Sequence, residues 1–154
     1  MSVIVAIDPG AQGAICILEN GMPNISKVRK NDFGLYYPFL TLHVDAVVIE
    51  KVNPYGQRAN SAFSFGRAYQ CALSYAETLV DKGAVFYNPT PQEWQKEIKK
   101  ITGIVLGEPK ERSIESAKKL YPDADYYKVR GAVDNNKTDA LLIAHYGMLK
   151  HSSI

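Results

Sequence analysis

The stretch Val3-Ile4-Val5-Ala6-Ile7-Asp8-Pro9-Gly10 decides the fold of this chain. Five consecutive apolar residues predict a strand that is buried on both faces, and the Pro-Gly pair after them predicts a turn. The carboxylate of Asp8 therefore stands where a buried strand leaves the core. A carboxylate in such a place is costly unless it is paired or bound to a cation.

Two further acids stand at the ends of apolar runs. Glu50 follows the run 46–49, and Asp139 directly precedes the run 140–144. Taken singly, Asp8 could be a turn former and Asp139 an acid that faces the dipole at the start of a helix. Three such acids, far apart in the sequence, instead suggest side chains that converge on a site for a hard cation such as Mg²⁺, which takes oxygen ligands.

Hydrophobic periodicity and turn residues predict alternating strands and helices along the whole chain. The expected strands are Val3–Ile7, Ala14–Glu19, Ile25–Arg29, Ala46–Ile49 and Ala84–Tyr87, with a hairpin turn at Asn20-Gly21. The expected helices are Phe33–His43, Ala59–Leu79, Pro91–Lys100 with Thr90 as N-cap, Pro109–Leu120 and Asn136–Met148, and the stretch 123–136 is expected to be irregular.

This order predicts one α/β domain over residues 1–154. Three antiparallel strands are followed by parallel strands, and helices flank the mixed five-stranded sheet. The first strand should lie centrally, with the strand 46–49 parallel to it. Asp8 and Glu50 would then share the carboxyl edge of the sheet, where open α/β sheets bind ligands.

Composition bounds the function only loosely. The chain has 154 residues, 46% of them hydrophobic, and a net charge of +2, so it can bury a core and its overall charge does not indicate nucleic-acid binding. Its basic residues gather in one stretch, which is either a solvated helix face or a phosphate-contacting surface. These residues are Lys96, Lys99, Lys100, Lys110, Arg112, Lys118 and Lys119.

The cysteines and the N-terminus predict the compartment. Cys16 and Cys71 lie in apolar segments without metal-ligand spacing, which predicts buried free thiols in a reducing compartment. The N-terminus carries no signal-peptide pattern, and no apolar run reaches membrane-spanning length. We therefore expect a soluble, cytoplasmic protein.

Four segments resemble, in order, the motifs of RuvC-type Holliday junction resolvases, which have a ribonuclease H-like fold. They are Ile7-Asp8-Pro9-Gly10, Ile49-Glu50-Lys51-Val52, the segment 60–68 and the segment 138–144. The short chain is more similar to phage-encoded members than to cellular ones. The resemblance implies a homodimeric endonuclease that nicks symmetric strands of a four-way DNA junction. It also implies that Asp8, Glu50 and Asp139 bind two Mg²⁺ ions, for which Mn²⁺ can substitute.

The chain departs from the family pattern at the fourth acid. The family carries Asp or His three positions before its last Asp, and this chain has Asn136 there. Asn136 has the right helical spacing from Asp139, whereas Asp134 offers a full negative charge. We predict Asp134 as the fourth ligand, with Asn136 as the alternative.

The resemblance also implies DNA contacts. Lys110 matches a helix-start lysine near the family's active site, and Lys96 matches a second lysine with an ambiguous alignment. Tyr55 is the candidate for stacking on unpaired junction bases, with Arg58 on a phosphate. The helix 59–79 is a candidate dimer element, because its small and aromatic residues recur at steps of three and four. These residues are Ala62, Phe65, Ala68, Tyr69 and Ala72.

Two other functions compete with this interpretation. The segment 8–13 also resembles the phosphate-contacting hairpin of actin-like and sugar-kinase ATPases, but those enzymes enclose the nucleotide between two such halves and 154 residues supply one. The second alternative is a non-catalytic DNA-junction binding protein of the same fold. The missing acid at position 136 favours it, and the presence of Asp8, Glu50 and Asp139 argues against it.

Overall fold

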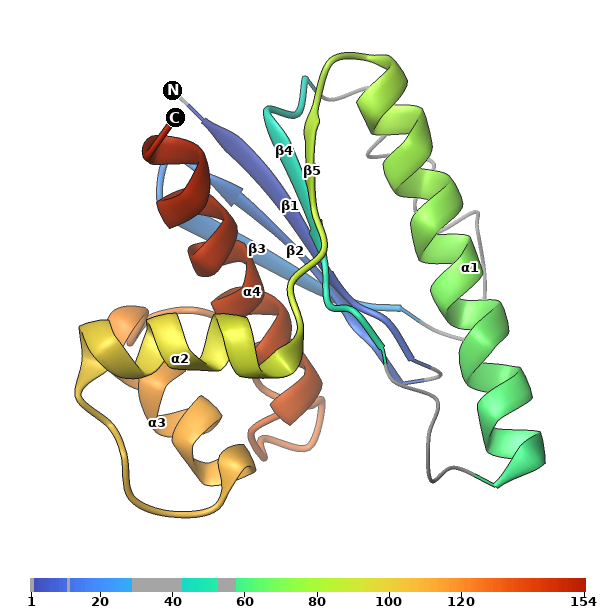
Figure 1. The fold of residues 1–154 in the computed structure, drawn as a ribbon. Coiled ribbons are helices and arrows are strands. Elements are labelled where there is room, and N and C mark those ends of the chain that lie inside the picture. The colour runs from blue at the N-terminus through green and yellow to red at the C-terminus, as the bar shows by residue number, and fades with distance from the viewer. Residues whose placement is uncertain (1, 11, 29–42, 53–57) are drawn as a thin grey trace.

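The computed structural model describes residues 2–10, 12–28, 43–52 and 58–154. Its strands are β1 (Val3–Asp8), β2 (Ala14–Glu19), β3 (Met22–Lys27), β4 (Ala46–Ile49) and β5 (Val85–Tyr87). Its helices are α1 (Ala59–Asp81), α2 (Pro91–Thr102), α3 (Pro109–Leu120) and α4 (Asn135–Ser152). The strands form one sheet in the order β3-β2-β1-β4-β5 (Figure 1). The first three strands are antiparallel, and β4 and β5 run parallel to β1, which confirms the predicted fold class.

Helices cover both faces of the sheet. In Figure 1, α1 lies on one side and α2, α3 and α4 lie on the other. Successive side chains of β1 point to opposite faces of the sheet and so contribute to both hydrophobic clusters. Ile4 and Ala6 belong to the cluster with α4, while Val5 and Ile7 belong to the cluster with α1. All four side chains are fully buried, as the continuous apolar run predicts.

The hairpin β2–β3 begins earlier than predicted. Asn20 and Gly21 both have positive φ, as a two-residue hairpin turn requires, and pairing starts directly after them with Glu19 opposite Met22. The strand therefore begins at Met22 rather than at Ile25. Pro23 is tolerated within β3 because this is an edge strand, where a missing N–H costs no ladder hydrogen bond.

Most other boundaries agree with the sequence to within a few residues. Thr90 caps α2 in a capping box with Glu93, as its position before Pro91 predicts. The expected helix Phe33–His43 falls, apart from His43, outside the described residues, and His43 itself is not helical. Cys16 is a buried free thiol as predicted, whereas Cys71 is only half-buried.

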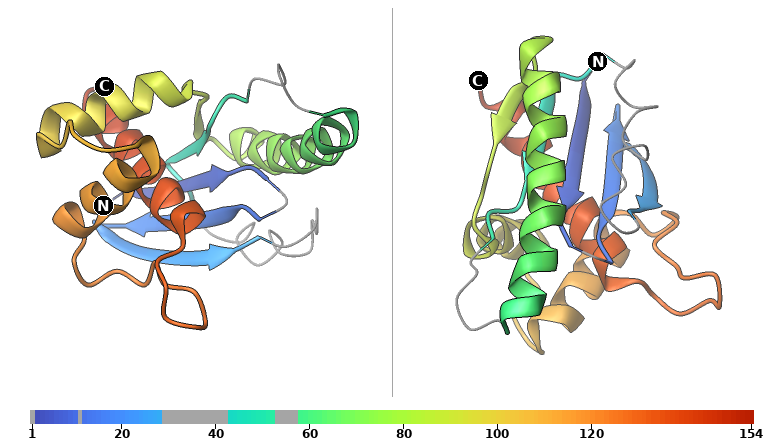
Figure 2. Two further views of the ribbon diagram at one scale, coloured as in Figure 1. Left: turned by 90° about the horizontal axis from the view of Figure 1, so that it is seen from below. Right: turned by 90° about the vertical axis from the view of Figure 1, so that its right-hand side faces the viewer.

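The two halves of α1 differ in their packing. Ala72, Tyr75 and Leu79 are buried against the sheet, but toward the N-terminus the helix extends past the ends of the strands (Figures 1 and 2). Phe63 in that part is 71% exposed. Of the proposed dimer stripe, Ala68 and Ala72 are buried within the chain, while Ala62 and Phe65 are half-buried.

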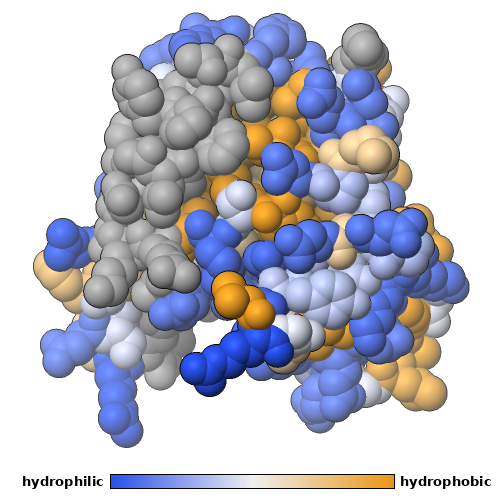
Figure 3. All heavy atoms as spheres, turned by 180° about the vertical axis from the view of Figure 1, so that it is seen from behind, coloured by the Kyte–Doolittle hydropathy of each residue, from blue (hydrophilic) through white to orange (hydrophobic). Residues whose placement is uncertain are grey.

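The rear face of the molecule is mainly polar outside the grey segments. Figure 3 shows charged and polar side chains over most of the rear face, with apolar side chains in a central band beside the grey segments. Among the residues that the structure describes, no helix has both the length and the apolar character needed to cross a membrane.

Helix α4 packs unusually close to the centre of the sheet. A Cβ at Gly147 would clash with Cγ2 of Val48 on β4 and would lie 3.0 Å from Cγ2 of Ile4 on β1. Glycine is therefore needed at this helix position despite its low helix propensity. The close contact fixes the distance between α4 and the two central strands.

We predict that Gly147→Ala lowers the free energy of unfolding by about 1–3 kcal/mol, because overpacking outweighs the gain in helix propensity. Gly66→Ala is the matched control, since that helical glycine has no atom within 4 Å of an added Cβ. The control should raise stability by about 0.5–1 kcal/mol. Urea denaturation of both variants checks the pair, and a stabilised Gly147→Ala protein would contradict the close packing.

Candidate active site

Parallel pairing places two acids side by side at one edge of the sheet. Asp8 is the last residue of β1, and Glu50 directly follows β4. Ile7 lies opposite Ile49 in the parallel register, so the residues after them leave the sheet on neighbouring strands. This is the carboxyl edge at which the sequence predicted the two acids to meet.

Helix α4 brings Asp139 to the same edge. Burial is the largest cause that raises the pKa of Asp8 well above its usual range, and the negative charges of Asp139 and Glu50 raise it further. Carboxylates raise one another's pKa in this way when they lie near one another in a poorly solvated region. The structure thus brings together the three acids that the sequence singled out.

Asp139 receives hydrogen bonds from two helices, one of them its own, and lies near a lysine. Burial raises its pKa to about 7, hydrogen bonds from Ser113 and Asn135 and the charge of Lys110 lower it, and the charge of Glu50 raises it. Ser113 lies on α3 and Asn135 is the first residue of α4. The influence of Lys110 shows that this predicted lysine, at the start of α3, lies near the acids.

Glu50 is held by a neutral donor. Burial raises its pKa, and the indole N–H of Trp94 opposes this by donating a hydrogen bond of 2.6 Å to Glu50 Oε2. Trp94 lies on α2, is 1% exposed, and is the single tryptophan of the chain. One carboxylate oxygen is thereby fixed without adding a positive charge that would repel a cation. The sequence analysis missed this contact, and only the cap before α2 hinted that the helix starts beside Glu50.

The three carboxylates are suitable ligands for a divalent cation, although the side chains do not form a complete coordination site. Within residues 2–10, 12–28, 43–52 and 58–154, no three His, Cys, Asp or Glu side chains are arranged so that they could hold a metal ion together. The three acids are nevertheless hard oxygen donors, and their burial and mutual repulsion would be relieved by a bound cation. Asp8, Glu50 and Asp139 are the residues that would hold it.

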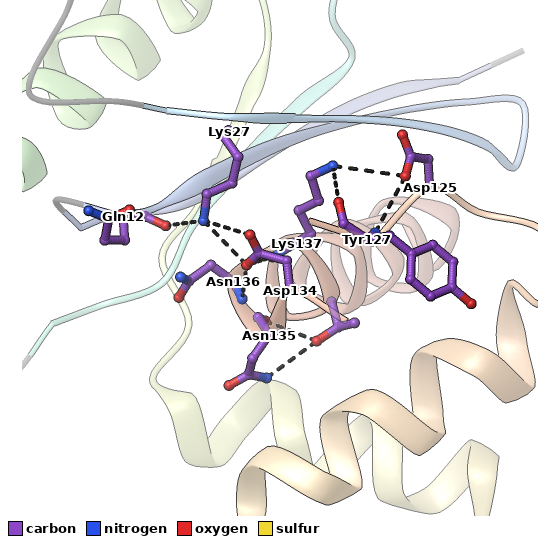
Figure 4. A network of polar contacts seen from close by, with 9 residues as sticks. Gln12, Lys27, Asp125, Tyr127, Asp134, Asn135, Asn136 and Lys137 are labelled. Carbon is purple, nitrogen blue, oxygen red and sulfur yellow. Dashed lines mark hydrogen bonds and ion pairs between the residues drawn. The ribbon is translucent and has the colours of Figure 1, made fainter. Parts of the chain in front are cut away.

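Asp134, the predicted fourth ligand, makes other contacts in the structure. It is the N-cap of α4 and accepts hydrogen bonds from the backbone N–H groups of Asn136 and Lys137 (Figure 4). Its Oδ2 also pairs with Lys27 Nζ at 3.0 Å. Burial alone would raise the pKa of Asp134, but Lys27 and the two N–H groups outweigh it and lower that pKa. The ligand role of Asp134 stays a prediction, and its contacts favour a cap.

Lys27 is a site residue that the sequence analysis missed. Asp8 pairs with Ala14 and Ala14 pairs with Lys27, so the lysine leaves the sheet at the same edge, two strands from Asp8. Its Nζ also donates to the backbone oxygen of Gln12 at 2.5 Å. Counting the hairpin register from Asn20-Gly21 would have found it, once the strand was started at Met22.

Two cavities flank the acids. One of about 480 Å³ is lined by Gln12, Lys27, Lys110, Lys128, Val133, Asp134, Asn135 and Asn136. The other, of about 320 Å³, lies between α2 and α3, and Lys96, Lys99 and Arg112 are among its lining residues. Several cations of the basic stretch therefore border concave surfaces, as contacts to an anionic ligand require.

The remaining predicted site residues are exposed or lie outside the residues that the structure describes. Arg58 is exposed at the N-cap of α1, and Lys96 is exposed on α2. Tyr55 lies outside the described residues. Among the described residues, neither Arg58 nor Lys96 forms an ion pair or hydrogen bond with the three acids, and the DNA-binding roles of Arg58, Lys96 and Tyr55 stay predictions.

Solved structures resemble this chain over nearly its whole length. RuvC from T. thermophilus in complex with a Holliday junction substrate superposes with a TM-score of 0.66 at 15% identity, covering 99% of this chain and 96% of that chain. The chain has the fold of the RuvC resolvases. A second Thermus thermophilus RuvC structure gives a TM-score of 0.61 at 17% identity, covering 98% and 96% of the two chains.

A mitochondrial protein also has a similar structure, whereas comparisons of the sequence find no match. The yeast mitochondrial Holliday junction resolvase has a TM-score of 0.58 at 13% identity, covering 98% of this chain and 81% of that chain. No family model and no curated protein matches the sequence. The comparisons confirm the predicted ribonuclease H-like fold of RuvC-type resolvases, and the short motifs quoted above carry the resemblance in sequence.

We predict that Asp139→Asn stabilises the protein when divalent cations are absent. The folded-state pKa of Asp139 is raised to about 7, so the folded form holds this proton more tightly than the unfolded chain, and stability falls as the pH rises through about 7. Asparagine removes that cost. The free energy of unfolding at about pH 8 should rise by about 1–4 kcal/mol, and the gain should shrink toward about pH 5.

Thermal and urea unfolding in chelator at several pH values measure this difference. Asp123→Asn removes the same charge from an exposed loop position and serves as the control. A stabilisation by Asp139→Asn that does not depend on pH would contradict the assignment.

Proposed function

We propose that this protein is a structure-selective endonuclease that resolves four-way and other branched DNA junctions by paired nicks. The observation that carries the proposal is the position of Asp8, Glu50 and Asp139 at the carboxyl edge of the sheet. There the negative charges of Glu50 and Asp139 raise the pKa of Asp8. Support comes from the fold, which nearly the whole chain shares with a RuvC that was solved with a Holliday junction.

The chemistry of the acids supports phosphodiester hydrolysis. Two Mg²⁺ ions, or Mn²⁺ in their place, would supply an activated water and neutralise charge on the phosphate. This chain's own residues orient that site. Trp94 fixes one oxygen of Glu50, and Ser113 and Asn135 donate to Asp139. Lys110, whose charge acts on Asp139, would stabilise a negatively charged phosphate.

We further propose that DNA reaches the acids across a basic surface. Lys110 borders the cavity beside Asp134, and Lys96 borders the cavity between α2 and α3. Contacts from such lysines supply affinity that falls steeply with salt, without regard to base sequence. Arg58 on a phosphate and Tyr55 on an unpaired base complete the proposed contacts, since junction preference requires groups that meet unpaired or strained bases.

A homodimer is part of the same proposal. A four-way junction offers two equivalent scissile phosphates, and a protein with C2 symmetry matches this pseudo-twofold substrate. The N-terminal part of α1 is a candidate surface, because it extends beyond the sheet and exposes Phe63. Sedimentation that shows a monomer at micromolar concentration, free and on the junction, would contradict it.

We predict that the wild-type protein, incubated with a labelled four-way junction and Mg²⁺, produces symmetric paired nicks that chelator abolishes. Asp8→Asn should lower the cleavage rate at least about a hundredfold, because loss of a ligating carboxylate removes several kcal/mol of stabilisation from the transition state. Binding of the junction, measured by fluorescence anisotropy, should persist in the variant.

The same assay separates the alternatives. A wild-type protein that binds the junction but never cleaves it, in Mg²⁺ or Mn²⁺, would favour the non-catalytic binding protein. Glu108→Gln is the matched control, since this acid is exposed at the N-cap of α3 and, in the part of the chain that the structure describes, forms no ion pair with another side chain. Equal losses in both variants would remove Asp8 from its role.

The fourth ligand is tested by a second pair of variants. Asp134→Asn keeps a capping side chain but removes the charge that pairs with Lys27. If Asp134 ligates a cation, as the sequence predicts, this variant should lose cleavage about a hundredfold and need more Mg²⁺. If Asp134 is a cap, as its contacts favour, the Mg²⁺ requirement should stay unchanged and the rate should fall less than about tenfold.

Asn136→Ala is the partner experiment. A raised Mg²⁺ requirement in Asn136→Ala alone would assign the fourth ligand to Asn136. Cleavage rates measured over a range of Mg²⁺ concentrations distinguish these outcomes, and thermal unfolding of each variant shows whether the start of α4 is intact.

A further inference from the structure

Residues 127–133, in the stretch that the sequence predicted to be irregular, form a small β-hairpin. Tyr127 and Val133 make an antiparallel bridge, and Lys128 N–H donates to the oxygen of Ala132 at 2.7 Å. Gly131 N–H donates back to the oxygen of Lys128 at 2.9 Å, and Gly131 has a φ of +85°. A turn followed by a left-handed glycine is a common three-residue hairpin loop. We call residues 127–133 the tip hairpin.

The base of the tip hairpin is tied to the elements that carry the acids. Lys137 on α4 donates to the backbone oxygen of Tyr127 at 2.9 Å (Figure 4). Asp134 N–H donates to the oxygen of Tyr126 at 2.8 Å. Tyr126 is 1% exposed, so the chain just before the hairpin is anchored in the core. Lys27 on β3 pairs with Asp134 directly after the hairpin. The hairpin is therefore held in place rather than loosely attached.

The tip itself presents an apolar side chain between two cations. Val129 is 102% exposed, and its neighbours Lys128 and Arg130 are also exposed. In both views of Figure 2 the loop before α4 extends away from the body. Burial of Val129 contributes nothing to folding, and in the part of the chain that the structure describes neither cation forms an ion pair. These three side chains are free to contact a partner.

The tip hairpin stands beside the proposed active site. Lys128 lines the same cavity as Lys27, Lys110 and Asn135, and Asn135 donates to Asp139 at 3.4 Å. A DNA strand whose phosphate lies at the acids would thus pass the hairpin. One valine between two cations is far too small for a stable protein interface, which needs about 800 Å² on each partner, but it suits a polyanion with accessible base faces.

We propose that the tip hairpin is a DNA-contacting wedge that recognises the branch point of the substrate. Lys128 and Arg130 bind backbone phosphates, and Val129 packs against a base step that the branch has unstacked. Apolar side chains inserted between base steps act in this way in proteins that kink DNA. This inference rests on the proposed function, and it names the part of a branched substrate that this surface reads.

The test compares variants at the tip on two DNA substrates. Val129→Ser should reduce the preference for a four-way junction over duplex about fivefold, while Val129→Leu should retain it. A 2-aminopurine base at the branch point should brighten on binding of wild type and of Val129→Leu, and much less with Val129→Ser. Lys128→Gln and Arg130→Gln should weaken binding to both substrates and reduce the salt dependence by about one counterion each.

Leu106→Ser is the matched control, because Leu106 is 85% exposed on the loop between α2 and α3 and lies outside the proposed contacts. It should change neither the junction preference nor the 2-aminopurine signal. Thermal unfolding should show that all these exposed substitutions leave stability unchanged.

The outcomes separate the two proposals. If wild type binds and cleaves the junction but Val129→Ser keeps the full preference and the full 2-aminopurine signal, the proposed role of the tip hairpin is wrong. The proposed nuclease function would then be unaffected. If wild type binds no junction at all, the proposed function and the wedge fail together. If Val129→Ser alters only self-association in sedimentation, the tip is a protein contact and the wedge is overturned.

Discussion

The parallel pairing of β1 with β4 is the constraint on which the candidate site depends. It aligns Ile7 with Ile49, so that Asp8 and Glu50 leave the sheet on neighbouring strands. Residues 4–7 of β1 and all four residues of β4 are apolar and buried, and a slip by one residue would move their side chains to the opposite faces. The position of the two acids is therefore fixed by the hydrophobic core rather than by the acids' own contacts.

Helix α4 adds the third acid through the same core. The missing side chain at Gly147 lets α4 lie directly on Ile4 and Val48, and this contact sets where Asp139 stands relative to Asp8. The cap at Asp134 and its pair with Lys27 hold the start of the helix against the sheet edge. The stabilising interactions lie in the core and the cap, and the acids themselves repel one another. Lys27 and Lys110 offset only part of this repulsion, so the pKa values of Asp8 and Asp139 stay raised, and perturbed carboxylates of this kind gather at functional sites.

Neutral donors complete the arrangement. Trp94 binds Glu50 and Ser113 binds Asp139, so α2 and α3 each support one acid. A neutral hydrogen bond favours the ionised carboxylate and fixes its orientation, yet adds no charge that would compete with a cation. The two helices therefore contribute to the site although neither carries one of the three acids.

The sequence predicted the sheet, its order and the three acids because each depends on short-range signals. Buried strands appear in the sequence as runs of apolar residues, and an acid at the end of such a run indicates a functional position. Contacts made between distant elements were not predictable in this way. Lys27 required a correct hairpin register, Trp94 looked like an ordinary core residue, and the tip hairpin was hidden in a polar stretch whose turn depends on Gly131. The role of Asp134 also depends on a tertiary contact, since only the structure brings Lys27 to it.

We propose above that Asp8, Glu50 and Asp139 together hold the divalent cations. The most direct measurement is anomalous diffraction from crystals of the protein soaked in Mn²⁺. We expect an anomalous peak at the carboxyl edge of β1 and β4, with carboxylate oxygens of Asp8 and at least one of the other two acids at about 2.0–2.2 Å from the ion. Mn²⁺ bound elsewhere, with the three carboxylates pointing away from one another and from any ion, would contradict it.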